Sequence, residues 1–142
     1  MDKRDQIAPC GLDCFNCEIF SQNITDQLRE MMARHRGISP EDAACDGCRV
    51  MMAKDKPFLN CATYKCAKKK GVEFCFQCNE FPCSNLMPAR DGADRYPHNF
   101  KLYNLSRMKL IGIDKWIDES MNIRKRYFKG KFVIGTGPVL ED

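Results

Sequence analysis

Ten cysteines dominate the chemistry that this sequence could carry, and all of them lie between Cys10 and Cys83. They occur in short-range sets, Cys10-x3-Cys14-x2-Cys17, Cys45-x2-Cys48, Cys61-x4-Cys66 and Cys75-x2-Cys78-x4-Cys83. A gap of two residues lets a tight turn place both sulfurs on the same side, where they can bind one metal ion. The spacing therefore predicts a metal-binding protein.

A disulfide framework is the alternative explanation for so many cysteines. Disulfide-dense domains belong to oxidising compartments, whereas the N-terminal stretch Met1 to Pro9 has neither the apolar segment nor the cleavage site of an export signal. No apolar run approaches the roughly 20 residues of a membrane span. We therefore expect thiolate–metal sites in a soluble, cytoplasmic protein with no membrane segment.

The composition indicates one small domain whose charge depends on its metal. The 142 residues include 23 basic and 19 acidic side chains, which gives a formal charge of +4. A zinc ion held by four thiolates carries a net charge of about −2, so two such sites would bring the total to about zero. The basic composition is therefore no argument for nucleic-acid binding. Without its cysteines the N-terminal part is short of core residues, and we expect metal to supply stability there.

The cysteines divide into two candidate sites for structural zinc. The first combines two pairs that are far enough apart for a helix between them: Cys14, Cys17, Cys45 and Cys48. The second is the compact set Cys66, Cys75, Cys78 and Cys83. Cys61 competes with Cys66, and Cys10 could replace a member of the first set, so these two are the less certain ligands. Four thiolates around zinc leave no open position for water, which favours a protein-interaction module over an enzyme.

The same ligands also suit an iron–sulfur cluster. Cys10-x3-Cys14-x2-Cys17 has the spacing found in radical S-adenosylmethionine enzymes, but the chain is too short for the barrel that such an enzyme needs. The alternative from the enzyme class is therefore a redox component with an iron–sulfur cluster or a reactive thiol, with Cys10 and Cys61 as the candidate thiols. No hydrolase, phosphate-loop or deaminase motif occurs, so no catalytic residue is assigned.

Nucleic-acid binding is the second alternative, and it depends on a basic run near the C-terminus. The run contains cations with aromatic residues among them: Arg124, Lys125, Arg126, Tyr127, Phe128, Lys129, Lys131 and Phe132. Such a mixture suits a single strand, whose phosphates and bases it could contact. Cations at a helix C-terminus are equally explained by the helix dipole, and we favour that simpler interpretation.

Periodicity and turn residues predict a largely helical chain. A helix is expected over residues 24–36, ended by Gly37, and a short helical turn after Ser39. Gly47 is expected to permit the sharp backbone of a cysteine turn. A second helical region starts at Phe100, with Gly112 as an interruption. Asp114 is expected to cap the last helix, which carries Trp116.

The remaining segments are expected to be irregular. Residues 49–60 read as a loop or short helix, 61–83 as a turn-rich run and 84–98 as a linker, and the tail from Lys131 as a short extended segment with a turn. We expect no repeat longer than the cysteine pairs themselves. The fold class is thus a small metal-stabilised α+β protein, predominantly α. A cysteine-knuckle, zinc-ribbon-like region (residues 1–86) is followed by a helical segment with an extended tail (87–142), packed on it as one structural unit.

The cysteine layout resembles a known family. Three stretches are similar to the bacterial and archaeal proteins grouped as domain of unknown function 3795. They are Cys10-Gly11-Leu12-Asp13-Cys14-x-x-Cys17, Cys45-x-Gly47-Cys48 and Lys70-Gly71-Val72-Glu73-x-Cys75-x-x-Cys78-x-Glu80-Phe81-Pro82-Cys83. The stretch from Leu105 to Trp116 resembles the helical tail of that family. The resemblance implies bound metal, with no established activity. Many members end in a further cysteine knuckle, which this chain replaces by Tyr127-Phe128-Lys129-Gly130-Lys131.

Overall fold

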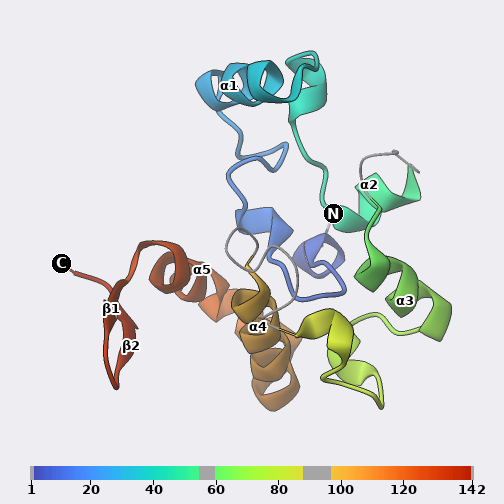
Figure 1. Cartoon of the computed structure of the whole chain (residues 1–142), viewed down its shortest axis with the longest axis vertical. Coiled ribbons are helices and arrows are strands. Elements are labelled where there is room, and N and C mark those ends of the chain that lie inside the picture. Colours follow the sequence, from blue (N-terminus) through green and yellow to red (C-terminus); the bar gives the residue numbers. More distant parts are fainter. Residues whose placement is uncertain (1, 55–59, 88–96, 142) are drawn as a thin grey trace.

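The computed structural model describes residues 2–54, 60–87 and 97–141. Its helices are α1 (Asp26–Arg36), α2 (Cys48–Ala53), α3 (Ala62–Lys70), α4 (His98–Ile111) and α5 (Ile113–Lys129), and short 3-10 turns occur before and between several of them. The strands β1 (Lys131–Val133) and β2 (Gly137–Val139) form one antiparallel hairpin. Figure 1 shows α1 at one end of the long axis, α4 and α5 towards the other, and the hairpin projecting from the end of α5.

Helix α1 confirms the helix predicted for residues 24–36. The Thr25 side chain caps its start by accepting the Leu28 N–H at 3.2 Å. Gly37 ends it in the left-handed region, with φ 65° and ψ 37°. The predicted turn after Ser39 is η3 (Glu41–Ala43), which lies against α1.

The junction of α4 and α5 is set by Gly112, which adopts φ 89° and ψ 158° and thereby separates the two helices. This confirms the predicted interruption. The predicted cap was wrong, however, because Gly112 itself precedes α5, and Asp114 lies inside its first turn. The carboxylate there faces the positive end of the helix dipole, so Asp114 still stabilises the helix start without capping it.

Helix α3 corrects the prediction that residues 61–83 form a turn-rich run, because 62–70 are helical. The Cys61 sulfur accepts the Tyr64 N–H at 3.5 Å at the start of the helix, and Gly71 ends it with φ 67°. Alanine and lysine, which favour helix, outweigh the presence of Cys66 within it. Of residues 49–60, those up to Ala53 form α2, while 55–59 lie outside the described residues. The predicted linker 84–98 contains the turn η5 (Ser84–Leu86), and its residues 88–96 are also outside them.

The predominantly helical class is confirmed, but a zinc ribbon is not shown. In the described part of the N-terminal region, the only strand-like pairings are the isolated bridges Ile7–Asp13 and Phe20–Cys45. Cys14, Cys17, Cys75 and Cys78 lie on or at the end of 3-10 turns, Cys48 begins α2, and Cys45 lies in the isolated bridge to Phe20. The predicted extended tail and turn are the β1–β2 hairpin, where Phe132 faces Pro138. No helix in the described ranges is long and apolar enough to cross a bilayer.

The hydrophobic core draws residues from both ends of the chain. Ile7 and Phe74 from the cysteine-rich region are fully buried with Leu105 of α4 and Trp116 of α5. The Phe15 ring meets the Trp116 ring edge-on, with centroids 6.3 Å apart. Several cysteines lie in or against this core: Cys10, Cys14, Cys17, Cys48, Cys75 and Cys83. The thiols are therefore part of the packing and not a separate appendage.

Candidate metal centre

Two of the cysteine pairs share one sequence pattern, Cys-Phe-Asn/Gln-Cys-x-x-Phe. The first knuckle is Cys14-Phe15-Asn16-Cys17, followed by Phe20, and the second is Cys75-Phe76-Gln77-Cys78, followed by Phe81. The expectation of no repeat beyond the cysteine pairs was therefore wrong. Asparagine and glutamine differ by one methylene group, and this difference conceals the repeat in a search for identical residues.

The two knuckles also share a backbone conformation. In each, the second cysteine donates its N–H to the carbonyl of the first, at 3.0 Å and 3.1 Å. The following phenylalanine donates to the carbonyl of the second cysteine, at 3.1 Å and 3.2 Å. Cys17 and Cys78 have nearly equal dihedral angles, φ −71° and ψ 138° against φ −75° and ψ 139°. The same turn therefore presents two thiols at two places in the fold.

The backbone brings the remaining pair of the first set to the first knuckle. Cys45 donates its N–H to the Ile19 carbonyl and accepts from Ser21, both at 2.8 Å. Gly47, with φ 88°, allows the turn between Cys45 and Cys48, as predicted. The Gly47 N–H points to the Cys45 sulfur at 3.4 Å. Burial nevertheless raises the pKa of the Cys45 thiol, and the hydrogen bond from the Gly47 N–H opposes this rise.

The second set lines one pocket. Its volume is about 410 Å³, and its walls include the four predicted ligands Cys66, Cys75, Cys78 and Cys83. The Cys78 sulfur accepts from the Glu80 N–H at 3.5 Å and from the Lys70 ammonium at 3.7 Å. Lys70 also forms an ion pair with Glu80 at this pocket. Helix α3 therefore contributes both a thiol and a cation to the second set.

The thiols interact strongly within each set. The hydrogen bond between the Cys14 and Cys48 thiols lowers the pKa of Cys14 and raises the pKa of Cys48. Burial, together with charge on neighbouring thiols, raises the pKa of Cys75 to about 12. Several thiols this close cannot all ionise without a compensating cation, and a bound dication supplies that charge. The chemistry of the donor sets therefore fits zinc or another soft metal.

The arrangement falls short of a coordination shell. Across residues 2–54, 60–87 and 97–141, which include all ten cysteines, no three Cys, His, Asp or Glu side chains are placed so that they could hold one metal ion. The backbone thus gathers the members of each predicted set without closing a tetrahedron around a common centre.

The two less certain ligands occupy different environments. Cys10 is buried, and burial raises its pKa to about 11. A charge on Cys10 would raise the pKa values of Cys48 in the first set and Cys75 in the second. The Pro9 carbonyl accepts the Cys75 N–H at 2.9 Å. Cys61 is exposed at the start of α3.

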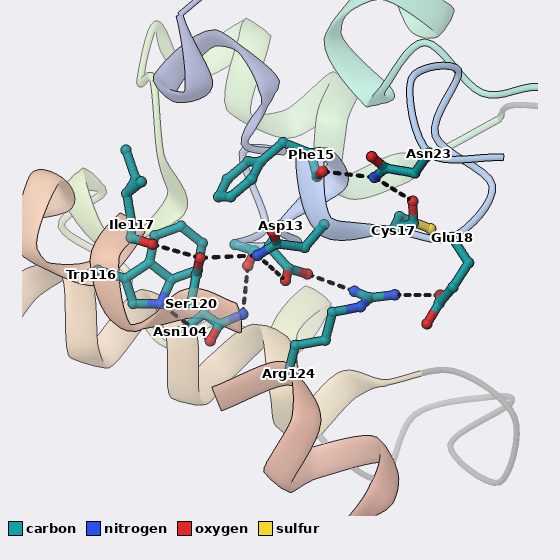
Figure 2. A network of polar contacts seen from close by, with 12 residues as sticks. Asp13, Phe15, Cys17, Glu18, Asn23, Asn104, Trp116, Ile117, Ser120 and Arg124 are labelled. Carbon is teal, nitrogen blue, oxygen red and sulfur yellow. Dashed lines mark hydrogen bonds and ion pairs between the residues drawn. The ribbon is translucent and has the colours of Figure 1, made fainter. Parts of the chain in front are cut away.

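A polar network that sequence analysis missed attaches the first knuckle to α4 and α5 (Figure 2). Arg124 donates to the buried Asp13 carboxylate at 2.7 Å and to Glu18 at 3.0 Å. Asn16 donates to Asp13 at 3.1 Å and to the Ser120 hydroxyl at 2.9 Å. No local pattern signals these contacts, because the partners lie on separate elements. The sequence placed Arg124 in a basic run, whereas in the structure its guanidinium pairs with Asp13 and Glu18.

A second part of the network holds the loop that carries Cys10. Asn104 of α4 is fully buried, donates to the Gly11 carbonyl at 2.8 Å and accepts from the Trp116 indole at 3.3 Å. Gly11 has φ 89°, and a Cβ there would lie 2.9 Å from both the Leu105 side chain and the Lys101 carbonyl. Only glycine allows this loop to lie against α4.

Comparison with known proteins supports the resemblance seen in the cysteine layout. Residues 6–88 match the model of the family described as "Protein of unknown function (DUF3795)". The match ends before α4, so the resemblance of the helical tail lies outside it. No curated protein and no solved structure matches the chain. Because the matched segment is more than half of the chain and contains every cysteine, the chain belongs to the DUF3795 family.

Proposed function

We propose that the protein is a binding module whose fold is held by two zinc ions, each bound by four cysteine thiolates. Cys14, Cys17, Cys45 and Cys48 would form the first site. Cys66, Cys75, Cys78 and Cys83 would form the second. The observation that carries the proposal is the duplicated knuckle, because one turn conformation recurs with Cys14/Cys17 and with Cys75/Cys78, and each copy lies beside a further pair of thiols.

The location of the thiols supports a structural role. Cysteines pack against the same core as Phe74 and Trp116, so a metal bound to them would stabilise the packing directly. A site closed by four protein ligands has no free position for substrate or water. The proposed function of the fold is therefore to bind another protein. Exposed apolar side chains on the hairpin, Phe132 and Ile134, support that role.

Site-resolved metal counting tests this proposal. The paired variants Cys17→Ser with Cys45→Ser, and Cys66→Ser with Cys78→Ser, each remove one ligand from the knuckle and one from the other pair of one site. Elemental analysis of anaerobically purified protein should give two zinc ions per chain for the parent and one for each paired variant. The Cys61→Ser variant is the matched control, because this thiol is exposed and outside both sets; it should keep both ions.

Three results would contradict the proposal. A parent protein without metal would remove its basis. Equal metal loss in the Cys61→Ser control and the paired variants would show that the assignment of ligands is wrong. A brown protein that contains iron and acid-labile sulfide would instead support an iron–sulfur redox component.

A further inference from the structure

A groove separate from the thiol clusters lies between the first knuckle and α5. Its volume is about 710 Å³, within the range of pockets that hold small ligands. Lys3, Lys125 and Lys129 supply its charged walls, and Phe15, Leu28 and Phe128 supply apolar ones. The groove therefore combines an anion-binding edge with an aromatic surface.

The positive charge of the groove is available to a ligand. Lys125 and Lys129 are four residues apart on α5, so they lie on one face of the helix. Within the described part of the chain, no carboxylate lies within ion-pair distance of Lys3, Lys125 or Lys129. The Glu18 carboxylate, which also lines the groove, is paired with Arg124 at 3.0 Å. The Lys3 ammonium lies over the Phe15 ring, with its Nζ 5.5 Å from the ring centroid. None of the three ammonium groups is held in an ion pair by a described residue, so they can bind phosphate oxygens.

The other lining groups suit a planar, hydrogen-bonding ring. The Arg124 guanidinium lies over the Phe128 ring, with its Cζ 4.9 Å from the ring centroid. The residue is nevertheless 50% exposed, and a base would stack on the part of the ring that Arg124 does not cover. Asn16 and Asn23 line the groove and spend their amide N–H groups on Asp13, Ser120 and two backbone carbonyls. Their carbonyl oxygens are therefore the groups that could accept a hydrogen bond from a ligand, such as the amino group of a base.

The walls of the groove are held in place before any ligand arrives (Figure 2). Asn23 donates to the Phe15 carbonyl at 2.8 Å and to the Cys17 carbonyl at 2.9 Å, which fixes the loop before α1 to the first knuckle. Arg124 fixes α5 to the same knuckle through Asp13. Rigid walls reduce the conformational entropy that a ligand would have to remove on binding.

We propose that this groove binds a nucleotide unit, with its phosphate on Lys3, Lys125 and Lys129 and its base against Phe128. The unit is either a free mononucleotide or a residue of a single strand, since both present the same phosphate and base. The proposal is independent of the metal sites. Of the cations in the predicted basic run, it uses Lys125 and Lys129 alone. Arg124 is paired internally, Arg126 donates to the Pro138 carbonyl at 3.2 Å, and Lys131 pairs with Glu141 at 2.9 Å.

Isothermal titration of the full, metal-loaded chain tests the groove. The probes are AMP, adenosine, inorganic phosphate and a short single-stranded oligoadenylate. AMP or the oligonucleotide should bind at low ionic strength, with adenosine and phosphate at least tenfold weaker, and the affinity should fall as salt is added. The paired variant Lys125→Gln with Lys129→Gln should weaken binding by about tenfold or more, because two charge-assisted hydrogen bonds are lost.

The matched control removes two cations elsewhere. Lys68→Gln with Lys69→Gln alters the exposed end of α3 and changes the net charge equally, and it should leave binding nearly unchanged. Binding of AMP identifies the free nucleotide as the source, and binding of the oligonucleotide alone identifies a single strand. No binding of either probe would overturn the proposal. So would an equal loss in both paired variants, because it would show a response to net charge alone.

Discussion

Asp13 and Arg124 form an ion pair at 2.7 Å across 111 positions of sequence. Asp13 is fully buried next to Cys14, and Arg124 comes from the middle of α5. The pair therefore connects the first cysteine knuckle to the last helix. Because the two ends of the chain share this contact and one core, we expect the cysteine-rich region and the C-terminal helices to unfold together.

Removing the cation should destabilise the whole fold. Arg124→Gln leaves the Asp13 carboxylate buried without its charged partner, which costs about 3 kcal/mol in the free energy of unfolding. Urea unfolding followed by circular dichroism measures the change. Lys115→Gln, an exposed change of the same charge on the same helix, should alter the stability by less than about 0.5 kcal/mol. A similar stability of the two variants would show that the buried pair does not join the two regions.

The close approach of Gly11 to α4 should be sensitive to a single methyl group. Gly11→Ala introduces a Cβ 2.9 Å from Leu105 and from the Lys101 carbonyl, at a residue with φ 89°. We expect a loss of about 3 kcal/mol from crowding and backbone strain together. Gly112→Ala is the control, because Gly112 has the same φ and open space around it. The Gly112→Ala variant should lose only the contribution of backbone strain, about 1 kcal/mol in the free energy of unfolding. Equal losses would refute the crowding explanation.

Asn104 should be intolerant of an apolar replacement. Asn104→Leu leaves both the Gly11 carbonyl and the Trp116 indole N–H buried without a partner. The expected loss is about 3 kcal/mol in unfolding free energy, with a shift in the emission of the only tryptophan. Asn122→Leu changes an exposed residue of α5, and it should alter neither the stability nor the tryptophan emission. An unchanged emission spectrum in Asn104→Leu would contradict the hydrogen bond.

The Arg4–Glu73 pair predicts a specific dependence on pH. Two hydrogen bonds of 2.9 Å and 2.7 Å from Arg4 lower the pKa of the Glu73 carboxyl. The pair therefore stabilises the fold above the unfolded-state pKa of glutamate, about 4.3, and this stabilisation is lost as pH falls through the lower folded-state pKa. Unfolding of the parent and of Glu73→Gln should differ at pH 6, and the difference should shrink as the pH falls below about 4. A constant difference over that interval would exclude the ionised pair as its cause.

Local patterns were sufficient for those parts of the fold that short-range chemistry decides. Gly37 and Gly112 set helix ends by their own conformation, and the structure places them as predicted. Helix α3 was missed because the cysteines at both ends of 61–83 suggested turns throughout. The helix propensity of the alanines and lysines between them proved stronger.

Long-range contacts could not be predicted from a single sequence. The spacing grouped Cys45 with Cys14 and Cys17 as ligands, and backbone hydrogen bonds to Ile19 and from Ser21 place Cys45 beside the segment after Cys17. Nothing near Asp13 or Arg124 in the chain identifies the other as its partner. Their pairing depends on how α5 packs on the first knuckle, which only the assembled core determines. For this reason the sequence did not reveal that Arg124, a cation of the basic run near the C-terminus, forms an internal ion pair.

X-ray absorption at the zinc edge of the anaerobically purified protein tests the central claim most directly. Two sites of four thiolates predict sulfur as the only first-shell scatterer, four per zinc at about 2.3 Å. Zinc content measured on the same sample should be two ions per chain. Nitrogen or oxygen scatterers in the first shell, or a sample whose metal is iron with sulfide, would contradict two structural zinc sites made of these eight cysteines.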